Sequence, residues 1–207
     1  PDDWRPSVIM VTPRTFDRAS PFQLLEWICH RYGFGTYLHH IVGRLDSGSF
    51  QESREIQERL VQAMRERKGA IYVDTMISPS MASALAQSLQ MPGVSGMDNN
   101  TILFEFGVHD PEEVLDEVVE GIGMAGAPRM NRLVLRHGDN FFGARKNIHV
   151  WLTWHDARNA NLMILLAYIL LGHKDWHGAE ISIYAAYPRS EVKERARDLH
   201  AMITGGR

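Results

Sequence analysis

The side chains most able to do chemistry in this chain are its ten histidines, which could bind a metal ion. His39 and His40 are neighbours in a predicted strand, so their side chains point to opposite faces and are badly placed to share one ion. The chain contains no His-Glu-x-x-His spacing and no other known spacing of metal ligands. We therefore expect no metal site and interpret the histidines as structural or surface residues.

The search for a nucleophile or a catalytic acid gives two candidates, Cys29 and Asp156. Cys29 lies in an apolar helical run without a partner motif, which favours a small buried side chain. Asp156 follows a predicted strand, where α/β enzymes often place a catalytic acid, but no paired carboxylate or cofactor loop accompanies it. A turn or helix-capping role is the better interpretation of Asp156. We expect no catalytic residue, no cofactor and no enzymatic activity.

Two segments are candidates for binding a phosphate or another small ligand. Residues 121–126 have the Gly-x-Gly-x-x-Gly spacing, but they follow a predicted helix, whereas phosphate binding needs a strand, then the loop, then a helix. The second segment is the switch point of a doubly wound sheet, at the carboxyl ends of its first and fourth strands. Thr12, Arg14 and Gly107 would converge there as weak candidates for a small-ligand site.

Short apolar runs alternate with amphipathic ones in the order expected of an α/β protein. Continuous apolar runs such as 7–12 are typical of strands buried on both faces of a parallel sheet. Helices are predicted to begin at the N-caps Ser20 and Asp110, each followed by proline. The clearest helix is 49–67, with Phe50 among its inward side chains. The predicted strands are 7–12, 36–42, 70–77, 101–106 and 131–136.

These elements predict a doubly wound, mostly parallel α/β unit over residues 1–146 and a second, incomplete unit over residues 147–207. The second unit has a strand, a helix, a strand and a helix, too little to close a sheet. It either extends the first sheet or belongs to something larger. Its helix 159–171 is apolar all round. Core packing and a dimer contact are both open interpretations, and the contact would involve Leu162, Leu165, Leu166 and Ile169.

Composition narrows the class of protein. The net charge of −3 argues against nucleic acid as a partner, because phosphate binding needs a basic face. A single cysteine excludes an internal disulfide and indicates a reducing compartment. No apolar run approaches the length of about 18 to 20 residues that crosses a bilayer, and no signal peptide opens the chain. We expect a soluble, cytosolic fragment of a longer protein that does not itself insert into the bilayer.

Three stretches carry a family resemblance. Trp4-Arg5-Pro6-Ser7-Val8-Ile9-Met10-Val11 resembles the opening of the cytosolic C-terminal domain of cation-chloride cotransporters. Asn147-Ile148-His149-Val150-Trp151-Leu152, with the apolar helix 162–171 after it, resembles a strand and helix of the same domain. Trp176 followed by 180–184 fits that domain's next strand. Order and spacing agree over nearly the whole chain, and the divergence suggests a prokaryotic member.

The resemblance implies a non-catalytic domain with two subunits of universal-stress-protein-like fold. It implies dimerisation and regulation of a symporter that moves chloride with sodium or potassium. The partners would be the protein's own transmembrane domain and a second copy, on the cytoplasmic side of the cell membrane. The alternative is a stand-alone nucleotide-binding protein of the universal-stress type, which requires a glycine-rich phosphate loop that the sequence lacks.

Overall fold

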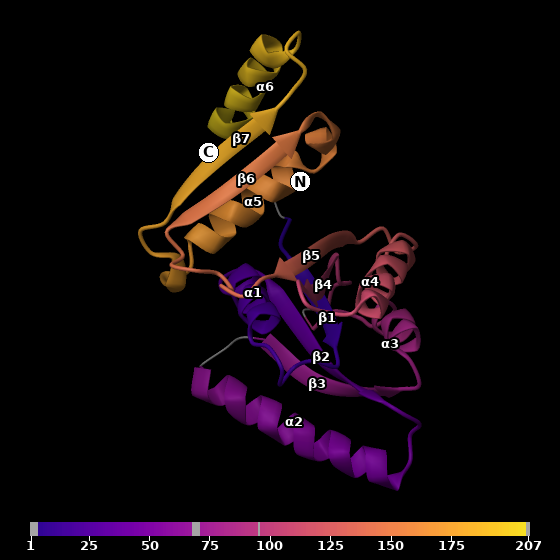
Figure 1. Cartoon of the computed structure of the whole chain (residues 1–207). Coiled ribbons are helices and arrows are strands. Elements are labelled where there is room, and N and C mark those ends of the chain that lie inside the picture. The colour runs from indigo at the N-terminus through magenta and orange to yellow at the C-terminus, as the bar shows by residue number, and fades with distance from the viewer. Residues whose placement is uncertain (1–3, 68–70, 95, 206–207) are drawn as a thin grey trace. The chain divides into compact units, whose positions relative to one another are not determined.

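A computed structural model of the chain describes residues 4–67, 71–94 and 96–205 (Figure 1). The chain divides into two compact units, Pro1–Phe142 and Gly143–Arg207. The boundary between the units therefore follows Phe142, whereas the sequence pattern put it after residue 146.

The first unit is built on a five-stranded parallel sheet with the order β3-β2-β1-β4-β5. The strand β1 lies at the centre, and the order of the sheet reverses between β1 and β4. This arrangement confirms the prediction of a doubly wound α/β fold, and it places the switch point at β1 and β4 as expected. The strands are β1 Ser7–Thr12, β2 Phe34–Val42, β3 Ile71–Ser78, β4 Thr101–Gly107 and β5 Asn131–His137.

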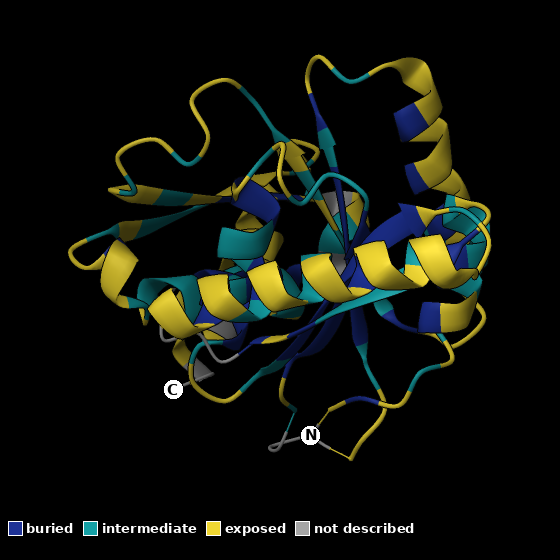
Figure 2. Cartoon of the chain, turned by 90° about the horizontal axis from the view of Figure 1, so that it is seen from below, coloured by how far each residue is buried: buried dark blue, intermediate teal, exposed yellow. Residues whose placement is uncertain are grey.

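Helices cover both faces of this sheet. Right-handed crossovers place α1 and α2 on one face and α3 and α4 on the other. Figure 2 shows α2 crossing in front of the buried strands with its outer face exposed. The helices are α1 Ser20–Cys29, α2 Ser47–Arg67, α3 Met81–Ser88 and α4 Glu112–Met124.

The core forms because alternate residues of a strand point to opposite faces. Ile9 and Val11 of β1 pack in one cluster with Leu85 of α3 and Val118 of α4. On α1, Cys29 is only 2% exposed, which confirms its interpretation as a small buried side chain. Burial raises the pKa of the Cys29 thiol to about 12, so the reactive thiolate is strongly disfavoured.

Two helix starts differ from the prediction. The N-cap of α1 is Ala19, and Ser20 is the first helical residue rather than the cap. The N-cap of α4 is Pro111. Asp110 cannot cap α4 because its carboxylate instead accepts hydrogen bonds from the Arg18 side chain and the Gly107 backbone.

The predicted inward face of α2 is wrong at its first turn. Phe50 is 56% exposed, whereas Leu60 and Met64 are buried as expected. The first turn follows the largely exposed loop 43–46. The side chains on the face of α2 that points toward the sheet therefore become buried only after this first turn. Ser53 is the first buried residue of that face, and its hydroxyl shares a hydrogen bond of 2.6 Å with Thr75 Oγ1 on β3.

The second unit has its own two-stranded parallel sheet, separate from the first, so the expectation that it might extend the first sheet is wrong. Val150 and Leu152 of β6 form a small core with Ala160, Ile164 and Ala167 of α5. The elements are β6 Asn147–Thr153, α5 Ala160–Leu171, β7 Glu180–Ala186 and α6 Val192–Gly205, with short 3-10 turns at Trp154–Arg158 and Lys174–Trp176.

Asp156 has the capping role that its position predicted. Its carboxylate accepts hydrogen bonds of 2.7 Å from both the backbone and the hydroxyl of Thr153, while the Thr153 hydroxyl accepts from the His155 backbone. The two residues form a capping box at the start of the turn Trp154–Arg158. The hydrogen bonds from Thr153 lower the pKa of Asp156 and hold it in the charged form.

Candidate functional site

Four ionisable side chains meet at the carboxyl edge of the first sheet. They are Arg18 from the β1–α1 loop, Glu105 near the end of β4, Asp110 from the β4–α4 loop and His137, the last residue of β5. Their side chains are 11%, 3%, 17% and 14% exposed, respectively. We call this group the ionic cluster; it lies next to the switch point of the fold.

The guanidinium of Arg18 holds the ionic cluster together. Its Nη2 donates to Asp110 Oδ1 at 2.8 Å and its Nη1 to Asp110 Oδ2 at 2.9 Å. The same Nη1 lies 3.1 Å from Glu105 Oε2 and contacts His137 Nε2. Glu105 Oε1 also accepts the hydroxyl proton of Thr12 at 3.0 Å. One cation is thus shared by two carboxylates and an imidazole, which come from β4, the β4–α4 loop and β5.

The electrostatics of the ionic cluster favour the charged forms of Arg18 and Asp110. Burial opposes the charge of Arg18, but the hydrogen bond to Asp110 and the charge of Glu105 outweigh it and raise the pKa of the guanidinium. Burial would likewise raise the pKa of Asp110, but hydrogen bonds from Arg18 and from the Gly107 backbone lower it below its ordinary value. The ion pair therefore persists over a wide pH range.

The lowered pKa of Asp110 predicts the pH dependence of stability. The ion pair contributes stability above the pKa of an unfolded aspartate, about 3.9, and loses it as the pH falls through the lower pKa of the folded state. We expect Asp110→Asn to destabilise the chain at about pH 7 and to flatten the loss of stability in acid. Urea unfolding from neutral pH to about pH 3 measures both effects.

The Arg18→Met background is the control for this prediction. Without the guanidinium, the main cause of the lowered pKa of Asp110 is gone. In this background Asp110→Asn should therefore have a much smaller effect on the fall of the free energy of unfolding with decreasing pH. An equal flattening in both backgrounds would show that Arg18 does not set the titration of Asp110.

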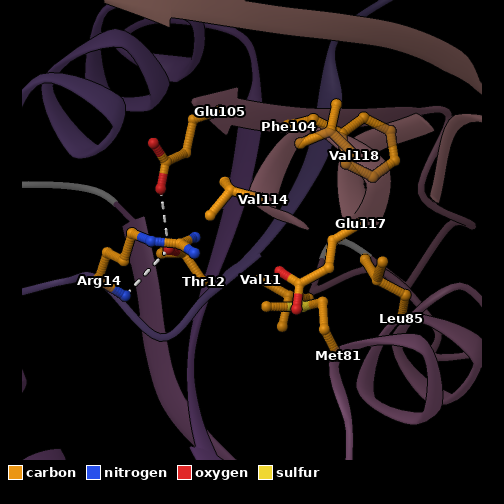
Figure 3. Close-up of a pocket in the computed structure, with 10 residues that line it drawn as sticks. All are labelled: Val11, Thr12, Arg14, Met81, Leu85, Phe104, Glu105, Val114, Glu117 and Val118. Atoms are coloured by element: carbon orange, nitrogen blue, oxygen red, sulfur yellow. Dashed lines mark hydrogen bonds between the residues drawn. The ribbon is translucent and has the colours of Figure 1, made fainter. Parts of the chain in front are cut away.

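The three predicted ligand residues do not line one cavity. Thr12 and Arg14 line a small pocket of about 20 Å³ with Glu105 and apolar walls (Figure 3), which has room for about one water molecule. The Thr12 hydroxyl is already engaged, because it donates to Glu105 and accepts the backbone N–H of Arg14. Gly107 lines a different pocket of about 280 Å³, beside Arg18, Asp110 and His137.

The histidines that the sequence singled out are held by protein groups. His39 Nδ1 lies 2.7 Å from Thr15 Oγ1, and His40 Nε2 lies 3.1 Å from the Ser78 carbonyl oxygen. Burial, with smaller contributions from nearby positive charges, lowers the pKa of His39. Within residues 4–67, 71–94 and 96–205, no three histidine, cysteine or acidic side chains gather closely enough to hold a metal ion.

The predicted contact residues of α5 lie away from the core of the second unit. Ile164 and Ala167 face the β6–β7 sheet and are buried. Leu165 is 39% exposed and Tyr168 is 47% exposed, while Leu162, Leu166 and Ile169 are half-buried beside them. We call these five residues the α5 outer face.

Sequence reasoning missed the ionic cluster, although one signal for it was present. Glu105 interrupts the apolar strand 101–106, and a charge in a buried strand needs a partner. That signal indicates that some cation lies nearby, but it does not identify Arg18 or His137.

Comparison with known proteins gives a distant similarity. No protein-family model matches the chain. Potassium/chloride cotransporter 3 of Caenorhabditis elegans is 23% identical to it over 212 residues, which cover 93% of this chain. The chain spans 19% of the length of that relative. The similarity links the chain to cotransporters at a distance. None of the described helices is long and apolar enough to cross a membrane.

Proposed function

We propose that the chain is a non-catalytic, cytosolic regulatory and dimerisation domain of a secondary transporter that couples chloride to potassium, sodium or both. The observation that carries the proposal is the similarity to a potassium/chloride cotransporter over 93% of the chain. The three stretches that resemble the cytosolic domain of that family agree with it in order. The domain would be attached to its own transmembrane part on the cytoplasmic side of the cell membrane.

The α5 outer face supports the dimerisation part of the proposal. The helix carries no charged residue from Ala160 to Leu171. An amphipathic surface helix normally presents charged side chains on the face away from the core. Here that face presents leucine, isoleucine and tyrosine, the kind of surface that pairs with a second copy in symmetric dimers.

Sedimentation equilibrium of the 207-residue chain tests this role. We expect a reversible dimer, and Leu165→Glu should weaken it by at least about tenfold, or about 1.4 kcal/mol, because the interface would bury an unpaired charge. Val119→Glu is the matched control, since Val119 is a 60% exposed apolar residue on a helix of the first unit. A monomer at all concentrations, or equal weakening by both variants, would contradict dimerisation through α5.

The transporter assignment has its own test in the gene. If the domain belongs to a cotransporter, the reading frame that encodes it also encodes successive apolar segments of about 20 residues each. A reading frame without such segments would contradict the assignment, whatever the outcome of the sedimentation experiment.

The alternative function, a stand-alone nucleotide-binding protein, is not favoured by the site. A nucleotide at the switch point would bring phosphate groups toward the ends of β1 and β4. The carboxylates of Glu105 and Asp110 lie there, and the guanidinium of Arg18 is already paired with both. Excess absorbance near 260 nm in the purified chain would be the observation that revives this alternative.

A further inference from the structure

The charge on helix α4 is all of one sign. The helix, Glu112–Met124, contains five acidic side chains and no basic one. All five are exposed, and none of them forms an ion pair or a side-chain hydrogen bond with the residues that the structure describes. They are Glu112, Glu113, Asp116, Glu117 and Glu120.

The fold explains only part of this charge. The helix dipole favours acidic side chains in the first turn, which accounts for Glu112 and Glu113 but not for the three acids further along. Residues four apart are neighbours on a helix surface, so Glu112, Asp116 and Glu120 lie in one row, which we call the acidic column. Like charges at this spacing destabilise a helix. The acidic column therefore lowers the stability of α4, and no cation of the described chain compensates for it.

Two apolar side chains lie exposed next to the acidic column. Leu115 is 42% exposed and Val119, one helical turn further on, is 60% exposed. The buried residues of the helix are Val114, Val118 and Gly121, on the side that packs on α3 and β4 (Figure 1). Leu115 and Val119 thus contribute little to the core. We call these two residues and the acidic column together the α4 outer face.

We infer that the α4 outer face is the docking site for a basic amphipathic helix of a partner protein. Charge complementarity determines the occupant, because a row of three carboxylates attracts lysine and arginine side chains. Leu115 and Val119 add an apolar contact one turn long. A helix presents side chains at this same spacing, so leucines four apart can cover the apolar pair while basic residues in the adjacent row face the acidic column.

The same charges disfavour the other possible occupants. The acidic column repels an anionic lipid surface and the phosphate groups of nucleic acid. A symmetric contact with α4 of a second copy would place one acidic column against the other. The α5 outer face, which is the proposed contact with a second copy, carries no charge. The two surfaces therefore serve different partners.

The first test uses a synthetic amphipathic peptide of leucine and lysine, with all its leucines on one helical face. Its controls are a peptide of the same composition in shuffled order and a peptide with glutamate in place of lysine. We expect the lysine peptide to bind the ¹⁵N-labelled 207-residue chain saturably, to shift mainly the amide resonances of α4, and to bind more weakly at high salt. Shifts spread over all acidic surfaces, or equal binding of the shuffled peptide, would overturn the inference.

A charge-neutralised variant and its matched control separate docking from general attraction to an acidic chain. Asp116→Asn with Glu120→Gln should raise the Kd of the lysine peptide about fivefold, because two exposed ion pairs are lost. Glu55→Gln with Glu58→Gln removes the same charge from the exposed face of α2 and should leave the Kd within about twofold. Equal effects of the two double variants would contradict docking on α4.

Urea unfolding of the same variants shows whether the acidic column serves the fold. Neutralising Asp116 and Glu120 relieves the like-charge repulsion, so the urea midpoint of this variant should rise above that of the parent chain with an unchanged slope. A lower midpoint would mean that the two carboxylates stabilise the folded chain, and it would overturn the inference.

Discussion

Arg18→Met is expected to lower the free energy of unfolding by about 3–5 kcal/mol, which is the usual cost of removing one partner of a buried ion pair. Methionine keeps most of the length of the side chain but leaves Glu105 and Asp110 without their shared counter-charge. Glu105 suffers most, because its side chain is only 3% exposed. Urea unfolding at neutral pH, followed by circular dichroism, measures the loss.

Arg14→Met is the control for this prediction. Arg14 lies in the same β1–α1 loop, and its charge makes only the smallest of the contributions that lower the pKa of Asp110, after those of Arg18 and the Gly107 backbone. Its replacement should change the free energy of unfolding by no more than about 0.5 kcal/mol. Adding Glu105→Gln to Arg18→Met should restore part of the lost stability, because a buried neutral amide costs less than an unpaired carboxylate. A loss below about 1 kcal/mol for Arg18→Met, or no recovery in the double variant, would contradict the importance of the ion pair.

The sheet of the first unit could be predicted because its signals are local. The apolar run of β1 is continuous because both faces of that strand are covered, and this pattern is visible in six adjacent residues, Ser7–Thr12. The order of strands and helices along the chain then limits the topology through the handedness of the crossovers. The central place of β1 and the position of the switch point follow from such rules.

The ionic cluster could not be predicted because it depends on register between distant segments. Arg18 and His137 are 119 residues apart. His137 reaches the cluster because β5 pairs with β4 so that His137 lies beside Gly107. A shift of one residue in that pairing would turn His137 to the other face of the sheet. Sequence alone determines neither this register nor the rotamer in which the Arg18 side chain reaches the ionic cluster.

The error on the α2 face and the question left open for α5 both have physical causes. The α2 stripe that includes Phe50 has the correct helical period, but periodicity cannot show where along a helix the covering structure begins. The α5 helix is apolar on all sides, so its composition gives no preferred inward direction. Only the packing of Ile164 and Ala167 against β6 shows that Leu165 points outward.

The glycine-spaced segment yields the second large prediction, in which two alanine substitutions have opposite effects. Gly121 and Gly123 both lie in α4. A Cβ at position 121 would lie 2.6 Å from Phe104 Cε1 and 3.0 Å from Leu85 Cδ1, two buried core residues. Overpacking of this kind costs about 1–3 kcal/mol, more than the gain in helix propensity of up to about 1 kcal/mol. We expect Gly121→Ala to destabilise the chain by up to about 2 kcal/mol, the net of these two terms.

Gly123→Ala is the matched substitution, because a Cβ at position 123 meets no atom within 4 Å. It should stabilise the chain by about 0.5–1 kcal/mol through helix propensity alone. Urea midpoints with unchanged slopes would report both effects as changes in stability. Opposite signs would mean that Gly121 is required for the close approach of α4 to β4, so that the Gly-x-Gly-x-x-Gly spacing reflects helix packing and not phosphate binding. Stabilisation by both substitutions would mean that α4 lies further from Phe104 than this packing requires.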